Sequence, residues 1–194
     1  MFLKLDEIAQ KLDQIFLPLE QEGMTGMRLL LQNDVKATTQ ALKNAQEALG
    51  VNFPAKFTKL LSKFNLGNFE ICNVRFGSKG DYVSELVRLN SVDEFGGKWW
   101  SGEARPLNLI VFAAGDPWIF LLDCTSGAVY AWLLDDEEIC SRCIASDFEK
   151  FFIALASIDI ARLKDKAMPL AEQILKFVKA DEKALPFWQE MAQI

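Results

Sequence analysis

Four cysteines give this 194-residue chain its most conspicuous reactive side chains, and two of them form a C-x-x-C motif at residues 140–143. Such a motif is typical of a redox pair or of half a zinc site, which Cys72 and Cys124 would complete. We expect residues 139–145 to form a strand, in which residues three apart point to opposite faces. On that geometry the two thiols cannot share a metal, and we expect ordinary strand cysteines with no metal or cofactor. A turn or helix start at this place would restore the zinc interpretation.

The sequence contains no histidine. This excludes Ser-His-Asp and Cys-His mechanisms, His-ligated zinc and imidazole acid–base catalysis. Asp116 and Asp123 flank an apolar segment, but a strand of about 20 Å would separate them, too far for a general-acid pair. We interpret both as turn-forming residues. We therefore predict a protein that is not an enzyme; an enzyme that uses a lone cysteine or carboxylates stays as the less favoured alternative.

A run of four acidic residues, Asp135, Asp136, Glu137 and Glu138, lacks the alternating oxygen ligands of a calcium loop. It is either a solvated turn between strands or an electronegative patch that binds lysine and arginine side chains of a partner. The formal net charge is −6 and the isoelectric point is near 4.8. An acidic chain gains nothing from counterion release on DNA or RNA, so we expect no nucleic-acid partner and a basic protein partner instead.

Three tryptophans, Trp99, Trp100 and Trp118, lie in or beside segments that contain glycine. Large aromatic side chains in loops are good interface anchors, and they are equally good lids over a sheet edge. Both interpretations stay open for each of them. Together with the acidic run and Asp116, these tryptophans are our candidate partner-binding residues.

The stretch from residue 107 to residue 132 predicts three strands of an antiparallel meander. Its apolar runs, 107–114, 118–122 and 128–132, are rich in Ile, Val, Phe, Trp and Tyr and are separated by turn residues, Gly-Asp-Pro in one case and Asp-Cys-Thr-Ser-Gly in the other. The middle run is apolar at every position, so we expect it to be central in the sheet or covered on both faces.

Helical spacing of apolar residues surrounds this meander on both sides. We predict helices over 3–17, where Pro18 stops the helix, from Asp34 to Gly50, from Pro54 to about 64, over 81–89, and from 146 onward. The last of these begins with a capping box formed by Ser146 and Glu149. Pro169 and Pro186 each begin a later helical segment. We predict a further strand over 69–76. This order predicts an α+β fold, an antiparallel or mixed central sheet with helices packed against it.

Three ordered segments carry a family resemblance. Residues 41–67 contain a helix that ends in Leu-Gly, then Phe-Pro and a second helix; residues 113–132 contain Gly-Asp before an apolar strand; and residues 144–155 contain Ala-Ser-Asp-Phe-Glu-x-Phe. In this arrangement the chain resembles the SUKH superfamily, which includes fungal Smi/Knr-type cell-wall regulators and many bacterial immunity proteins. The resemblance implies a non-catalytic α+β binding domain. Some such domains neutralise toxins, many of them nucleases, and others act as regulatory scaffolds.

We expect one domain over residues 1–194, with a SUKH-like core at 34–158 and helical extensions at 1–33 and 159–194. The N-terminus carries charge from residue 4 and has no signal-peptide pattern, and no apolar stretch is long enough to span a membrane. We therefore predict a soluble cytoplasmic protein. The resemblance implies that it is an immunity protein, which would occlude the active site of a basic toxin domain. The alternative is a regulatory scaffold whose terminal helices bind partners; the oligomeric state stays open.

Overall fold

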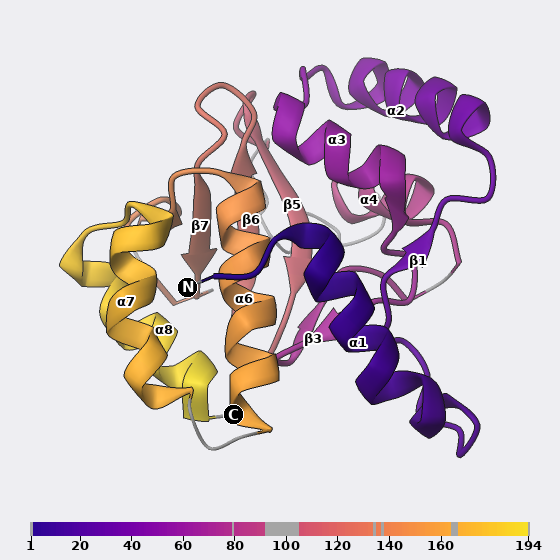
Figure 1. Cartoon of the computed structure of the whole chain (residues 1–194). Helices are drawn as coiled ribbons and strands as arrows, with labels where there is room; N and C mark the ends of the chain where they lie inside the picture. Colours follow the sequence, from indigo (N-terminus) through magenta and orange to yellow (C-terminus); the bar gives the residue numbers. More distant parts are fainter. Residues whose placement is uncertain are drawn as a thin grey trace.

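The computed structural model describes residues 2–78, 80–91, 105–133, 135–136, 138–163 and 167–193. It has an α+β fold in which helices pack against an antiparallel sheet, as predicted (Figure 1). The described elements are α1 (Leu5–Glu20), β1 (Leu30–Leu31), α2 (Val35–Leu49), α3 (Ala55–Lys63), β2 (Phe64–Asn65), β3 (Glu70–Ile71), β4 (Val74–Arg75), α4 (Tyr82–Leu89), β5 (Leu109–Ala114), β6 (Ile119–Asp123), β7 (Val129–Trp132), β8 (Cys143–Ala145), α6 (Phe148–Arg162), α7 (Met168–Val178), the 3₁₀ turn η2 (Glu182–Ala184) and α8 (Leu185–Gln193).

The main sheet has the strand order β3-β4-β5-β6-β7-β8, and every neighbouring pair is antiparallel. The meander is confirmed as β5, β6 and β7. Strand β6 lies inside the sheet and is covered on both faces, since Phe120 and Leu122 join the large core whereas Ile119 and Leu121 join a smaller apolar cluster. The uninterrupted apolar run of this strand follows from that double burial.

Helix α6 lies across one face of the sheet (Figure 1). It packs on that face through buried phenylalanines. The ring of Phe112 on β5 lies 5.2 Å from that of Phe148 and 5.6 Å from that of Phe151, both in edge-to-face geometry. Phe152 is likewise buried and lies 5.8 Å from Phe76. Edge-to-face pairs add about 0.5–1.5 kcal/mol each beyond the burial of their area, so this cluster fixes the helix against the sheet.

Side chains of α4 and its C-terminal cap take the place of a neighbouring strand along the outer edge of β5. Asn90 donates from Nδ2 to the Val111 carbonyl and accepts from the Val111 amide, each at 2.8 Å. The Tyr82 hydroxyl donates to the Phe112 carbonyl at 2.7 Å. Strand β4 pairs with β5 only at Arg75 and Ala114. The remaining edge of β5 is therefore satisfied by side chains, which places α4 beside the end of the β3–β4 hairpin.

Both terminal extensions pack into the same hydrophobic cluster as the central sheet. Ile8, Leu12 and Phe16 are the buried stripe of α1. In α8, Trp188 is fully buried and its indole nitrogen donates to the Ile144 carbonyl at 3.1 Å. Helix α1 continues two residues past Pro18, because a proline in the last turn removes only one helical hydrogen bond.

The segment 69–76 is a hairpin and not the single strand that its alternation predicts. Strands β3 and β4 are joined by Cys72 and Asn73, which have φ angles of 48° and 58°. Two consecutive residues with positive φ form the tight turn that matches the twist of a two-residue hairpin. Asparagine tolerates this conformation, whereas cysteine gives no turn signal in the sequence.

Two further boundaries differ from the prediction. Asp147 and not Ser146 is the N-cap of α6, and its carboxylate accepts from the Lys150 amide at 3.0 Å. The backbone amide of Ser146 donates to the Val178 carbonyl instead, so this residue belongs to the strand side of the junction. Strand β8 is limited to Cys143–Ala145, because residues 139–142 form a turn. The predicted caps of α2 are confirmed, with Asp34 at its start and left-handed Gly50 at its end.

Candidate functional site

The turn between β5 and β6 lies directly against the tip of the β3–β4 hairpin. A Cβ atom on Gly115 would lie 2.6 Å from the backbone oxygen of Asn73, so only glycine permits this approach. The next residue, Asp116, is exposed to solvent. Gly77 makes a similar approach at the other end of the hairpin, where a Cβ would lie 2.6 Å from the Gly67 oxygen. These two contacts fix the hairpin relative to the turn.

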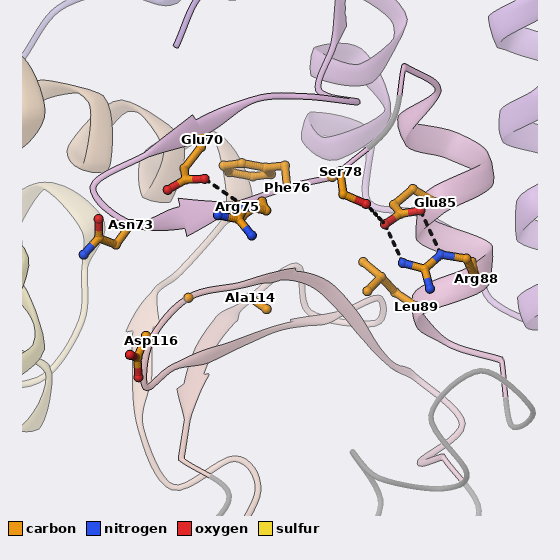
Figure 2. Close-up of a pocket in the computed structure, with 12 residues that line it drawn as sticks. Glu70, Asn73, Arg75, Phe76, Ser78, Glu85, Arg88, Leu89, Ala114 and Asp116 are labelled. Carbon is orange, nitrogen blue, oxygen red and sulfur yellow. Dashed lines mark hydrogen bonds and ion pairs between the residues drawn. The ribbon is translucent and has the colours of Figure 1, made fainter. Parts of the chain in front are cut away.

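A groove of about 530 Å³ opens between the hairpin, the end of β5 and α4 (Figure 2). Its wall includes two ion pairs that are already formed within the protein. Glu70 and Arg75 pair across the hairpin at 2.8 Å, and Glu85 and Arg88 pair along α4 at 2.6 Å. Three other lining residues have polar side chains: Asn73, Ser78 and Asp116. Three more are small: Gly77, Ala114 and Gly115.

The charges of the groove are not balanced. Glu85 is only 6% exposed, and its carboxylate accepts from Arg88 and from the Ser78 hydroxyl at 3.1 Å. Three carboxylates and two guanidiniums line the described part of the groove, which leaves one excess negative charge. Within the described residues Asp116 is the lining carboxylate with no ion-pair partner. The groove is therefore suited to bind a cation beside Asp116.

Asp135, Asp136 and Glu138 of the acidic run lie between β7 and β8, and they have different roles. The carboxylate of Asp136 accepts from the Leu133 amide at 3.1 Å and pairs with Arg142 at 3.2 Å, so it stabilises the turn itself. Asp135 and Glu138 are exposed and make no ion pair to any other described residue. Glu137 lies outside the described residues.

Trp118 is buried, with 6% of its surface exposed. Its ring lies 5.5 Å from that of Phe187 in α8, and its indole nitrogen donates to Glu190 at 2.9 Å. The lid interpretation therefore applies to this residue. The guanidinium of Arg142 lies 4.7 Å from the Trp118 ring, and so Trp118 joins the turn of Asp116 to the acidic turn at one end of the sheet. The other two candidate tryptophans, Trp99 and Trp100, lie outside the described residues.

The cysteines do not gather at one place. Cys140 lies in the exposed turn rather than on a strand, so the strand argument against a shared metal does not hold there. Within the part of the chain that the structure describes, no three or more His, Cys, Asp or Glu side chains form a group that could hold a metal ion. Burial raises the pKa of the half-buried Cys124 to about 12. Burial raises the pKa of Cys72 as well. These thiols are protonated at neutral pH and are poor nucleophiles.

Asp123 lies at the opposite end of the sheet from Asp116, since Asp123 pairs with Leu109 and Ile119 pairs with Ala114. Sequence reasoning found Asp116 but missed the rest of the groove. Its ion pairs come from a hairpin that was predicted as one strand and from the i, i+3 pair on α4. The spacing of Glu85 and Arg88 was the available signal, but nothing in the sequence places it beside Glu70.

Residues 36–154, more than half of the chain, match the model of the SMI1 / KNR4 family (SUKH-1), and the chain belongs to this family. The predicted resemblance is therefore confirmed, and membership supports a role in protein–protein interaction. The chain matched no curated protein and no solved structure. Among the described helices, none has the length and apolar character needed to cross a membrane.

Proposed function

We propose that this protein is a cytoplasmic immunity protein that binds a basic toxin domain, such as a nuclease, and occludes its active site. The observation that carries the proposal is the acidic rim, which we define as the exposed carboxylates Asp116, Asp135 and Glu138. Asp116 and the acidic turn are joined through Trp118 and Arg142 at one end of a rigid sheet. Unpaired carboxylates on a fixed support can bind lysine and arginine side chains without first breaking internal ion pairs.

Electrostatic attraction would act mainly on the rate at which the two proteins associate. The chain carries a net charge of −6, and exposed charges of opposite sign steer a partner toward the rim. Such steering weakens as salt concentration rises, because the Debye length shrinks to about 8 Å at physiological ionic strength. Tight binding would then depend on close packing around the rim.

The reactive groups of the described residues favour binding over catalysis. The chain has no histidine, and the thiols whose pKa is raised by burial are not activated. The groove carboxylate with the least exposure, Glu85, is held by Arg88 and Ser78 rather than directed at a substrate. These features support a protein that blocks the chemistry of another protein and performs none of its own.

The test uses the protein encoded by the neighbouring gene, produced in a catalytically dead form. We would compare wild type with the triple variant D116N/D135N/E138Q by stopped-flow mixing at two salt concentrations. Asp136 stays unchanged because it holds the β7–β8 turn. The matched control is E22Q/E47Q/E172Q, which removes three exposed carboxylates elsewhere.

The rim variant should associate about tenfold more slowly at low salt and show a flatter salt dependence, whereas the control should resemble wild type. Equal association rates for the rim variant and wild type would remove the rim from the interface. A neighbouring gene that encodes a metabolic enzyme, with no binding between the products, would contradict the immunity function.

A regulatory scaffold is the second candidate, and one surface favours it. Leu30 and Leu31 on the edge strand β1 are 51% and 64% exposed, and Val35 beside them is 58% exposed. L30S/L31S should abolish self-association or scaffold binding in analytical ultracentrifugation if this surface is used. Deletion of 159–194 is not a clean alternative test, since it would remove the buried Trp188 and Phe187 from the core.

A further inference from the structure

Within the described residues, the side chains of Asn73 and Asp116 are the groove acceptors that lie outside its two ion pairs and the Ser78 contact, and both lie at one end of the groove (Figure 2). Figure 2 shows Glu70, Asn73 and Asp116 around this end, with Glu85 and Arg88 at the other. The far end is closed by its own ion pair and by the Ser78 hydroxyl. A charged ligand would therefore be drawn to the end that contains Asp116.

The groove, with a volume of about 530 Å³, has room for the stem of a long side chain. Ala114 lines the groove with only a methyl group, and Gly77 and Gly115 line it with backbone. The Cβ positions of the two glycines are blocked by backbone oxygens of Gly67 and Asn73, 2.6 Å away in each case, so the glycines hold the groove wall in place. A methylene chain can lie on such a surface while its charged head reaches the acceptors.

A basic ligand fits this groove better than an acidic one. Arg75 and Arg88 already have carboxylate partners, so an anion would have to compete with Glu70 and Glu85. A cation needs only to displace water from Asp116. Between the two basic side chains, arginine has a planar group with five donors that can reach a carboxylate and a neighbouring amide oxygen together.

We propose that the groove receives an arginine side chain from a loop of the protein partner. Its guanidinium pairs with the Asp116 carboxylate and donates to the side-chain oxygen of Asn73, and its stem lies over Ala114 and Gly115. This inference rests on the proposed function, because it identifies the contact by which a basic partner is held at the acidic rim.

The test is an NMR titration with acetyl-Gly-Arg-Gly-amide as the probe, using backbone amide shifts. We expect millimolar binding with shifts at Asn73, Gly115 and Asp116. The citrulline peptide, which has the same shape without the charge, should not bind, and the lysine peptide should bind more weakly. D116N should weaken arginine binding about three- to fivefold, as expected for one exposed ion pair, and D135N should leave it unchanged.

Equal binding of the arginine and citrulline peptides, or equal binding to wild type and D116N, would overturn the inference. So would preferential binding of acetyl-Gly-Glu-Gly-amide. Failure of the peptide together with rim-dependent binding of the toxin would remove the groove and leave the proposed function standing. Specific peptide binding without any toxin binding would support the groove and contradict the proposed function.

Discussion

The two turns of the meander use the same residue type in opposite ways. At the turn between β6 and β7, the carboxylate of Asp123 accepts from the Thr125 amide at 2.8 Å and from the Ser126 hydroxyl at 2.7 Å. At the turn between β5 and β6, Asp116 is exposed and forms no ion pair with any other described residue. The Asp123 carboxylate is hydrogen-bonded within its own turn, whereas the Asp116 carboxylate is available to a partner.

This difference separates structural acidic residues from binding ones. A carboxylate whose acceptor positions are filled by local donors stabilises the backbone and has little left to offer. A carboxylate held on a rigid turn without a local partner costs little stability and can bind a cation. A substitution of Asp123 should therefore lower the free energy of unfolding and leave partner binding unchanged. A substitution of Asp116 should weaken partner binding and leave the free energy of unfolding nearly unchanged.

The largest effect on stability should come from Gly115→Ala. Its Cβ would lie 2.6 Å from the backbone oxygen of Asn73, and backbone cannot move aside as a flexible side chain can. We expect a loss of about 2–4 kcal/mol in the free energy of unfolding, measured by urea denaturation. The control is Gly127→Ala in the other turn, where φ is 81° and the nearest neighbour, Pro54, is at 3.7 Å. The free energy of unfolding of Gly127→Ala should fall by only about 1 kcal/mol. Equal losses for the two variants would contradict the close approach of Gly115 to the backbone of Asn73.

Asp123→Ala should lower the free energy of unfolding by about 1–2 kcal/mol, because the Thr125 amide and the Ser126 hydroxyl lose their acceptor. Asp123→Asn keeps an oxygen acceptor and should recover most of that loss. Thermal and urea unfolding of the two variants provide the measurement. A variant Asp123→Ala as stable as wild type would show that this carboxylate does not hold its turn.

The Asp147 carboxylate makes a pH-dependent contribution to stability. Burial opposes ionisation of this carboxyl, but hydrogen bonds from Lys56 and Lys150 outweigh it and lower its pKa from the ordinary value of 3.8. A folded-state pKa below the unfolded value gives stability that is present above about pH 4 and is lost as pH falls through the folded-state pKa. Asp147→Asn should cost about 0.5–1 kcal/mol at pH 7 and nothing near pH 2. An equal loss at both pH values in urea denaturation would exclude the charge as the cause.

The smallest effect on stability should come from Asp116→Asn, within about 0.5 kcal/mol of wild type. The carboxylate makes no ion pair with the rest of the described chain, so its charge stabilises nothing that the substitution removes. Urea denaturation at neutral pH is the measurement. A loss comparable to that of Asp123→Ala would show that Asp116 is as structural as its counterpart.

The meander could be predicted because each apolar run is short and is interrupted by residues that favour turns. The helices of the core followed from equally local signals, such as Asp34 and Gly50 at the two ends of α2. Local signals failed where two neighbouring residues could serve the same role. Ser146 and Asp147 are both good N-caps, and only the hydrogen bond of the Ser146 amide to Val178, far along the chain, decides between them.

The candidate site was predicted only in part for a related reason. Asp116 and the acidic run are visible as exposed charges in turns, but the groove depends on contacts between segments distant in sequence. Arg75 pairs with Ala114 between strands β4 and β5. Gly115 packs against the backbone oxygen of Asn73 in the hairpin turn. Trp118 illustrates the same limit, because α8 buries it from about 70 residues further along the chain.

The most direct test compares the two turns in binding rather than in stability. Isothermal titration calorimetry would measure the affinity of the neighbouring gene's product for wild type, D116N and D123N at one ionic strength, after each variant is shown to be folded. We predict that D116N weakens binding and that D123N binds as wild type does. Equal affinities for wild type and D116N, or a loss confined to D123N, would contradict the assignment of the Asp116 end of the sheet as the binding end.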